Sequence, residues 1–207
     1  MSQQLSQPEI AKNVTASIAR VVVYIVLYVA ISAITHYVIA DFLPRYRIYV
    51  IDYEVYVQIL LALGFGYMIV NGISWFFYWT MRAKYDHAAA AAVRNIVRII
   101  GVGAMVAAIA GGVAGGAAGV ALGGFLGMVV GFASQQVLGQ AIAGLFLLIA
   151  RPFRINDNVV IAGEEGVVDD VSTLFTKIVK VDGTTVLIPN NVIIGGKIYL
   201  KPKQAKS

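Results

Sequence analysis

The pattern of apolar and polar positions divides the chain into long apolar runs separated by short polar intervals. The first two runs, Val21–Ala40 and Val55–Met81, contain 20 and 27 residues, and neither contains Asp, Glu, Lys or Arg. A third run, Ile99–Ala150, contains 52 residues without any Asp, Glu, Lys, Arg or His. Because about 20 apolar helical residues cross a bilayer, this third run is long enough for two spans plus a short extra helix.

Small and polar residues inside the longest run indicate where its helices begin and end. We expect the third span to run from about Val93 to Ala110 and a tight turn to lie within Gly111–Gly116. The fourth span then continues to Gly131. Ser134–Gln136 is the first polar cluster of the run and predicts a break where the helix leaves the bilayer. Residues 137–150 are too few to span, so they predict an interfacial helix that ends before a proline.

Glycine is concentrated in the longest run, which contains 13 of the 21 glycines. Six of them are spaced four residues apart: Gly111, Gly115, Gly119, Gly123, Gly127 and Gly131. They form five overlapping GxxxG steps, a groove that lets helix backbones approach closely in lipid. We therefore expect a helix that packs against neighbouring helices along most of its length. The alternative is a hairpin rich in Gly and Ala that packs within one subunit.

The composition changes at Arg151, where short β-branched runs replace the long apolar runs. These runs are Val159–Ile161, Val167–Val168, Thr173–Val181 and Thr184–Ile188. The turn signals around them are Asn156–Asn158, Gly163, Gly166 and Asp182–Gly183. An Asp-Gly pair between two β-branched runs is a strong hairpin signal. Residues 151–200 therefore predict four or five strands in a small β-barrel, which is marginally stable alone and gains from packing against copies of itself.

Composition places the chain among membrane proteins. Hydrophobic residues make up 59% of the sequence and charged residues only 13%, against about 25% in soluble domains. The fold class expected is an integral membrane protein with about four transmembrane helices and a small C-terminal β-domain. The segments expected are a polar lead-in at 1–13, two peripheral helices within 14–81, a third span with a pore helix and interfacial helix within 82–150, the β-domain at 151–200 and a basic tail at 201–207.

The distribution of basic residues predicts the topology. Four spans place both termini on one side of the membrane, and Arg82, Lys84 and Arg94 then flank the spans on that same side, which we assign to the cytoplasm. The N-terminus does not have the pattern of a cleaved signal peptide. The net charge of +5 is explained by these flanks, so no nucleic-acid partner is expected. Arg94 and Arg98 lie on one helix face and are candidates for lipid contact in the cytoplasmic leaflet. Simple snorkelling is the favoured interpretation over a specific lipid or voltage role.

Little in the sequence indicates an enzyme, a cofactor or a metal. There is no cysteine, and His36 and His87 lie far apart, outside any metal-ligand spacing. The acidic pairs Glu164–Glu165 and Asp169–Asp170 are interpreted as solvated charges of turns and strand edges. We interpret His36 as a structural residue at the end of its span and Asn71 as the donor of an inter-helix hydrogen bond.

Four motifs in order resemble the small-conductance mechanosensitive (MscS) channel family. They are Gly131–Gly144, Arg151–Phe153, Val181–Gly183 and Ile188–Asn190. The resemblance implies a homoheptamer in which the last membrane helix of each subunit lines a central pore and the β-domain is Sm-like. Family members open under membrane tension and release ions and small solutes during hypo-osmotic shock. The family's C-terminal α/β cytoplasmic cage is not matched in this sequence, and the first span is additional to the family's minimal three.

The resemblance also assigns roles to individual residues. The two apolar rings of the family's pore constriction match Met128 and Phe132, where leucine is usual. The helix break matches Gln136, where glycine is usual, and the second hinge matches Gly144. The residues agree with the first assignment, because Met128 and Phe132 each follow a row glycine by one position, about 100° around the helix. Glycines can then face neighbouring subunits while Met128 and Phe132 face the pore axis.

The function expected is therefore a tension-opened channel in a prokaryotic cytoplasmic membrane, with lipids, permeating ions, small osmolytes and copies of itself as partners. The alternative is a non-conducting oligomeric membrane scaffold assembled through the β-domain. A secondary transporter is disfavoured, because the longest apolar run lacks the intramembrane ionisable residue that a coupling site needs.

Overall fold

The computed structural model describes residues 7–202. Residues 1–6 of the polar lead-in and 203–207 of the basic tail lie outside this part of the chain. The chain divides into two compact units, and the division falls between Gly127 and Met128. The division lies inside a helix, and the boundary at residue 151 stays a prediction.

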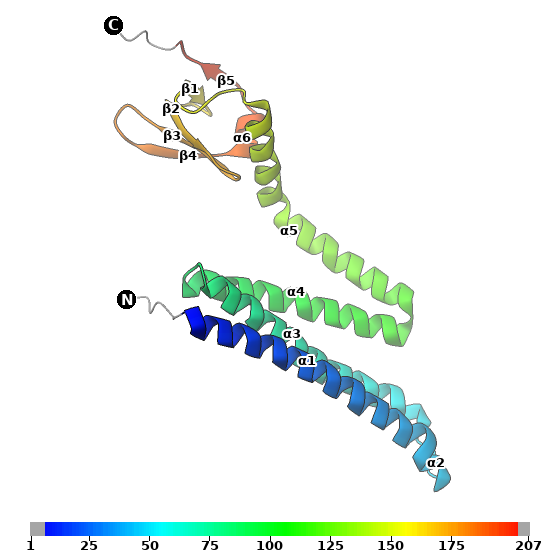
Figure 1. The fold of residues 1–207 in the computed structure, drawn as a ribbon. Coiled ribbons are helices and arrows are strands. Elements are labelled where there is room, and N and C mark those ends of the chain that lie inside the picture. Colours follow the sequence, from blue (N-terminus) through cyan, green and yellow to red (C-terminus); the bar gives the residue numbers. More distant parts are fainter. Residues whose placement is uncertain (1–6, 203–207) are drawn as a thin grey trace. The chain divides into compact units, whose positions relative to one another are not determined.

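Long helices make up the first unit (Figure 1). The helices are α1 (Gln7–Tyr37), the short α2 (Leu43–Arg45), α3 (Glu54–Arg82), α4 (His87–Ala114) and the start of α5 (Gly116–Ala150), with a π-helical turn at Val38–Phe42 and a 3₁₀ turn at Ile51–Tyr53. α3 packs along both α1 and α4. By length and composition, four segments can cross a membrane: Pro8–Arg45, Ile51–Arg82, His87–Ala114 and Gly116–Ala150. The predicted four-helix membrane architecture is confirmed.

Two pairs of polar residues join α1 to α3. Ser32 Oγ donates to Gln58 Oε1 at 2.7 Å, and Gln58 Nε2 donates to the carbonyl oxygen of Ser32 at 3.2 Å. One turn further along, His36 Nδ1 lies 2.6 Å from Glu54 Oε1. The inter-helix hydrogen bond predicted for Asn71 is not formed within the described residues, and Gln58 makes the corresponding bond instead. The structural interpretation of His36 agrees with its pairing to Glu54.

The link between α4 and α5 is a single residue. α4 begins at the capping residue Asp86, whose Oδ1 accepts a hydrogen bond from the Ala89 N–H at 2.9 Å, and ends at Ala114. Gly115 follows with φ +93°, a conformation that other residues rarely adopt, and α5 starts at the next residue. The turn lies inside the predicted interval, but the third span runs four residues beyond Ala110.

This position of the turn corrects the interpretation of the glycine row. Gly111 belongs to α4 and Gly115 to the link, so they cannot form one continuous groove with the others on the pore helix. Gly119, Gly123, Gly127 and Gly131 lie on α5. A spacing of four residues simply continued across a turn.

The predicted break at Ser134–Gln136 is wrong as a break in helical structure. α5 is helical without interruption from Gly116 to Ala150, so residues 137–150 continue this helix and do not form a separate one. Glutamine is a good helix former, and this cluster contains neither Gly nor Pro to interrupt the backbone bonds. The helix ends where predicted, before Pro152. The Arg151 N–H donates to the Leu147 carbonyl oxygen at 2.9 Å, and Arg151 has φ +48°, the left-handed conformation that ends many helices.

The β-domain is an antiparallel sheet of five strands in the order β4-β3-β2-β1-β5 (Figure 1). The elements are β1 (Asn158–Ile161), β2 (Glu164–Val171), β3 (Phe175–Val179), β4 (Thr185–Pro189), α6 (Asn190–Ile194) and β5 (Ile198–Leu200). β5 pairs with the free edge of β1, and within the described residues no ladder joins β4 to β5. The predicted C-terminal sheet domain is confirmed.

Glycines at two hairpins of the sheet have positive φ, as the turn signals predict. β1 and β2 are joined by Ala162 and Gly163, with φ of 54° and 82°. Between β3 and β4, Gly183 has φ +84° and its N–H donates to the Lys180 carbonyl oxygen at 3.0 Å. The prediction that Gly166 lies in a turn is wrong, because this residue lies inside β2. A Cβ there would lie 2.6 Å from the Val179 carbonyl oxygen on β3, so the close approach of the strands requires glycine.

The core of the β-domain is aliphatic, with one polar side chain at its centre. Its buried residues are Leu147, Phe153, Val159, Ile161, Val168, Ile178, Ile188 and Ile193. Asn190 is fully buried at the start of α6. Its Nδ2 donates to the carbonyl oxygens of Ser172 at 2.8 Å and Thr173 at 3.1 Å, and its Oδ1 accepts from Thr176 Oγ1 at 2.8 Å. Asn190 thus hydrogen-bonds to two carbonyl groups of the loop between β2 and β3 and to one hydroxyl group of β3.

We predict that Asn190→Ala destabilises the β-domain by about 1–3 kcal/mol, because it removes the partner of the buried Thr176 hydroxyl and of two partly buried carbonyl groups. The measurement is the midpoint of thermal unfolding of the purified protein in detergent. Asn191→Ala is the control, since Asn191 is the same residue type one position later but is exposed. Equal midpoints for the two variants would contradict the role given to Asn190.

Candidate functional site

The helix α5 leaves most of its surface without a partner in its own chain. It carries no charged residue, and large apolar side chains along it are exposed, including Val120 at 77% and Phe125 at 60%. Within the first unit, α5 approaches α4 most closely at small residues, and Leu126 of α5 also lies against Gly103 of α4. A Cβ at Gly119 would lie 2.8 Å from Gly111 Cα and 3.0 Å from the Ala107 carbonyl oxygen. This end of the glycine row therefore packs the hairpin within one subunit, as the alternative interpretation proposed.

The rest of the glycine row is not used in that way. A Cβ at Gly123 would make ordinary contact with Ala107 Cβ at 3.9 Å, and at Gly127 or Gly131 it would meet no described atom within 4 Å. The row is thus divided: Gly111 and Gly119 approach each other within the hairpin, whereas Gly127 and Gly131 leave a groove that is open in the single chain. An open groove of this kind suits the backbone of another helix in lipid.

Met128 and Phe132 lie on α5 beside this groove, and their residue surfaces are 58% and 70% exposed. They are four residues apart, so they share one helix face, and no ionisable residue lies on the helix. Several copies of α5 around one axis would place these side chains as two stacked apolar rings. Their role as a constriction stays a prediction.

The last turns of α5 pack on the β-domain through four buried residues. Gln140, Ala143, Gly144 and Leu147 follow the spacing of one helix face, and Leu147 belongs to the core of the β-domain. The opposite face is apolar and exposed, and consists of Leu138, Ile142, Leu145, Phe146 and Ile149. This part of α5 therefore has one face on protein and one available to lipid or to another subunit.

Gly144 lies where the helix comes closest to the sheet domain. A Cβ there would overlap the Thr173 carbonyl group, at 2.8 Å from its carbon, and would also collide with Asn190 Nδ2. The hinge role predicted for Gly144 is untested, but this contact gives an independent reason for glycine. Sequence reasoning missed that contact. The only signal was the Pro-Asn pair after the last long strand, because Asn190 holds the loop on which Gly144 packs.

Arg94 is held by aromatic rings rather than projecting freely. Its Cζ lies 4.4 Å from the centroid of the Trp75 ring and 5.9 Å from that of Tyr78, and Tyr78 Oη lies 2.8 Å from His87 Nδ1. Its Nε is buried and has no hydrogen-bond partner among the described residues. Arg98 lies one turn further along the same helix. Contact of both arginines with lipid stays a prediction.

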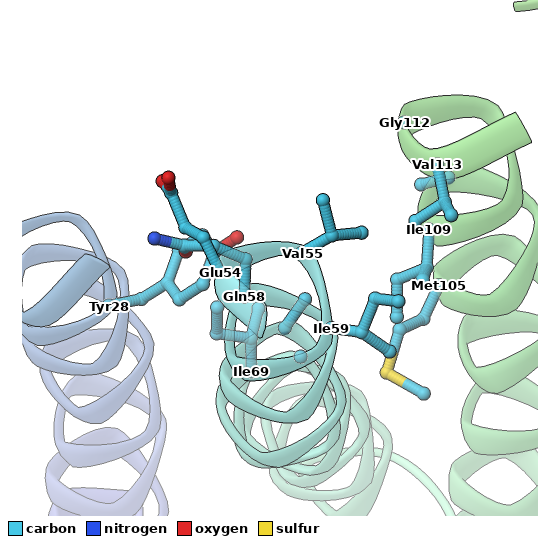
Figure 2. A pocket seen from close by; sticks show the side chains of 13 residues that line it. Tyr28, Glu54, Val55, Gln58, Ile59, Ile69, Met105, Ile109, Gly112 and Val113 are labelled. Carbon is cyan, nitrogen blue, oxygen red and sulfur yellow. The ribbon is translucent and has the colours of Figure 1, made fainter. Parts of the chain in front are cut away.

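A cavity of about 470 Å³ lies between α1, α3 and α4 (Figure 2). Figure 2 shows Glu54 and Gln58 of α3 near Tyr28 of α1, and Met105 and Ile109 on the α4 side. Glu54 is the only acidic residue of the lining, and it is already paired with His36. The cavity is otherwise mainly apolar, so its walls suit hydrocarbon rather than a polar substrate.

Three acidic residues of β2 form ion pairs with lysines of the β-domain. Glu164 lies 2.5 Å from Lys180 Nζ, Asp169 lies 2.8 Å from Lys177 Nζ, and Glu165 pairs with Lys201. Their hydrogen-bonded carboxylates raise the pKa of Lys177 and of Lys180. Both glutamates lie in β2 and not in a turn. Among residues 7–202, no group of three or more His, Cys, Asp or Glu side chains could hold a metal ion.

Comparison with known families finds a match in the C-terminal part of the chain. The family model described as "Mechanosensitive ion channel, beta-domain" matches residues 136–199. The matched region begins at Gln136, inside α5, and so includes the last turns of the helix, which pack on the sheet in this chain.

Curated relatives extend the match toward the N-terminus. The chain is 36% identical over 155 residues to the small-conductance mechanosensitive channel of Edwardsiella ictaluri, covering 72% of this chain and 53% of that protein. It is 42% identical over 71 residues to an uncharacterized MscS family protein of Archaeoglobus fulgidus, covering 34% of this chain and 25% of that protein. The chain therefore spans only about half, or less, of the length of these relatives.

Two solved structures share the fold. The closed state of MscS from Helicobacter pylori superimposes with a TM-score of 0.53 at 20% identity, covering 73% of this chain and 60% of that chain. MSL1 from Arabidopsis thaliana superimposes with a TM-score of 0.58 at 19% identity, covering 93% of this chain and 65% of that chain. At these identities the likeness concerns the fold alone.

We predict opposite effects for two glycines in the last turns of α5. Gly144→Ala should destabilise the docking of the helix on the β-domain by about 1–3 kcal/mol, because the Cβ overlaps backbone atoms that the core holds in place. Gly139→Ala should stabilise by about 0.5–1 kcal/mol, since no described atom lies within 4 Å and alanine favours the helix. Both effects are measured by the midpoint of thermal unfolding and by the rate of limited proteolysis in the segment that follows Ala150. A tolerated Gly144→Ala would contradict the docking role.

Proposed function

We propose that this chain forms an oligomeric pore opened by membrane tension, because it belongs to the MscS family of mechanosensitive ion channels. One observation of the structure carries the proposal. α5 is an uncharged helix of 35 residues with exposed apolar side chains, and a Cβ at Gly127 or Gly131 would meet no described atom within 4 Å. A membrane helix with an open glycine groove and a separate row of bulky apolar residues suits a ring of copies around a pore.

The assembly we propose is a homoheptamer in a prokaryotic cytoplasmic membrane. Its number of subunits and its membrane come from the family resemblance. The open groove at Gly127 and Gly131 supports packing between subunits, and the unpaired sheet edges of β4 and β5 leave surfaces for contacts between β-domains. Both termini and the β-domain would face the cytoplasm. Arg94 and Arg98 would then contact lipid of the cytoplasmic leaflet.

The gate we propose consists of Met128 and Phe132. Rings of bulky apolar side chains in a narrow pore make a water column unstable, so ions meet a barrier before the pore closes sterically. No ionisable side chain of α5 could form an electrostatic gate instead. Opening would displace the pore helices, with Gln136 and Gly144 as candidate hinges, and would release ions and small osmolytes during hypo-osmotic shock.

A recording of current from liposome patches under graded suction tests the function directly. A channel of this family should be silent at rest and open in steps as suction rises. The second candidate, a non-conducting scaffold, predicts intact oligomers without current at any suction below patch rupture. That result would overturn the proposed function and leave the β-domain as an assembly module.

Polar substitution at the constriction should favour the open pore. We predict that Phe132→Ser and Met128→Asn open at lower tension than the parent or leak at rest, because polar side chains let water enter the constriction. Phe132→Leu is the matched control and should behave as the parent, since the ring stays apolar. Single-channel recordings and growth of producing cells measure the effect. A Phe132→Ser channel that needs more tension and never leaks would place the gate elsewhere.

The divided glycine row yields a second prediction. Gly127→Leu should weaken or abolish the oligomer while leaving the α4–α5 hairpin intact, because the groove at Gly127 is open within the chain and overpacking an interface costs about 1–3 kcal/mol per subunit. Gly112→Leu is the control, because this α4 glycine also has open space but lies off the row. Size-exclusion chromatography with light scattering measures the oligomer. Equal oligomer populations in the two variants would exclude Gly127 from the subunit interface.

A further inference from the structure

A second, smaller cavity of about 180 Å³ lies between α1 and α3. Unlike the cavity of Figure 2, it is rich in hydrogen-bond donors and has no acidic residue in its lining. The donors come from Arg20 and Tyr24 of α1 and from Tyr67, Asn71 and Trp75 of α3. A cavity with a guanidinium, hydroxyl groups, an amide and no carboxylate suits an anion, because every charged or strongly polar group can donate to it.

Arg20 has no counter-ion in the described part of the chain. No carboxylate lies within 4.0 Å of its guanidinium, whereas Lys177, Lys180 and Lys201 all have one. The side chain of Asn71 likewise makes no hydrogen bond among the described residues. The donors of this cavity are therefore available to a ligand.

Tight packing holds Arg20 beside the cavity. A Cβ at Gly72 would lie 2.7 Å from Val21 Cγ2, so α1 and α3 approach closely at the residue that follows Arg20. On the α4 side of Trp75, the guanidinium of Arg94 lies 4.4 Å from the ring and adds a second positive charge near the cavity.

The cavity lies at the depth of lipid headgroups. Arg20 immediately precedes the apolar run Val21–Ala40, and Trp75 begins the aromatic run Trp75–Trp79 that ends the apolar part of α3. Aromatic and basic residues occupy this position at membrane interfaces. The anion that reaches such a site from the membrane is the phosphate of a phospholipid, and the uncompensated positive charge favours a lipid with net negative charge.

We propose that this cavity binds the phosphate of an anionic phospholipid, held by Arg20 with the polar groups of Tyr24, Tyr67 and Asn71. The site depends on α1, so it is distinct from the proposed pore, and lipid binding there does not require conduction. A lipid bound in this place bridges α1 and α3 at one end of their contact, while Ser32 and Gln58 join them at the other.

Tryptophan fluorescence in vesicles tests the proposal, because the sequence has only two tryptophans and one of them lines the cavity. The full chain with Trp79→Phe keeps Trp75 as its single tryptophan. Brominated phosphatidylglycerol, mixed at increasing fractions into phosphatidylcholine vesicles, should quench Trp75 at lower fractions than brominated phosphatidylcholine does. Arg20→Gln should weaken the preference for phosphatidylglycerol about tenfold, because it removes a charged hydrogen bond of about 1.5 kcal/mol or more.

Two further variants separate binding at the cavity from general attraction to the surface. Lys12→Gln removes a charge from the same helix outside the cavity and should keep the preference, and Tyr24→Phe should weaken it while keeping the ring and the fold. Equal quenching by the two lipids, or an unchanged preference in both Arg20→Gln and Tyr24→Phe, would overturn the proposal. Loss of the preference in millimolar inorganic phosphate would also overturn it and identify a site for free anions.

Discussion

Hydrocarbon offers no hydrogen-bond partner to a peptide backbone, and this constraint governs the 52 uncharged residues from Ile99 to Ala150. Glycine would weaken a helix in water, but in lipid the alternative to the helix is a row of unpaired N–H and C=O groups. The run therefore stays helical through 12 of its 13 glycines and through the polar cluster before residue 137, and leaves the helix only at Gly115, where φ is +93°. One residue separates α4 from α5, and every other feature of the candidate pore helix follows from its position.

Because the hydrocarbon environment favours helix throughout this run, the main effect of its glycines is to set how closely neighbouring elements approach. The contacts differ from one glycine to the next. At Gly119 the neighbour is the backbone of α4, and at Gly144 it is the Thr173 carbonyl group of a loop. At Gly166 it is the Val179 carbonyl oxygen on the next strand. A Cβ at Gly127 would meet no described atom within 4 Å. Glycines that look alike in the sequence therefore make different contacts: one in the α4–α5 hairpin, one where α5 docks on the β-domain and one between strands. A further glycine leaves a surface open for assembly.

The sequence allowed the long-range organisation to be predicted, but not the contacts that depend on helix rotation. Four spans, the end of α5 before Pro152 and the hairpin at Gly183 follow from local rules on apolar length, proline and turn residues. The turn at Gly115 could be placed only within six residues, because several adjacent glycines permit the same conformation and their spacing continues unchanged across it. The choice of Gln58 rather than Asn71 as the inter-helix donor depends on which face of α3 meets α1, and that is decided by packing. Gly166 resembled a turn signal because a glycine required by a neighbouring strand is indistinguishable, in one sequence, from a glycine required by φ.

The packing of the last turns of α5 bears on where this helix could bend. Leu147 is part of the β-domain core and Gly144 is in contact with its loop, so bending at Gly144 would separate buried surfaces. Exposing one leucine side chain alone costs about 1.5–3 kcal/mol, before any loss of packing around Asn190. Between Gly131 and Gly139, by contrast, every side chain of α5 is exposed in this chain, and bending there breaks no packing within its own unit. Gln136 lies in that interval, and the family's β-domain also begins there. Of the two candidate hinges, the energetics of this conformation therefore favour Gln136, with the part of the helix beyond Gln140 moving together with the sheet.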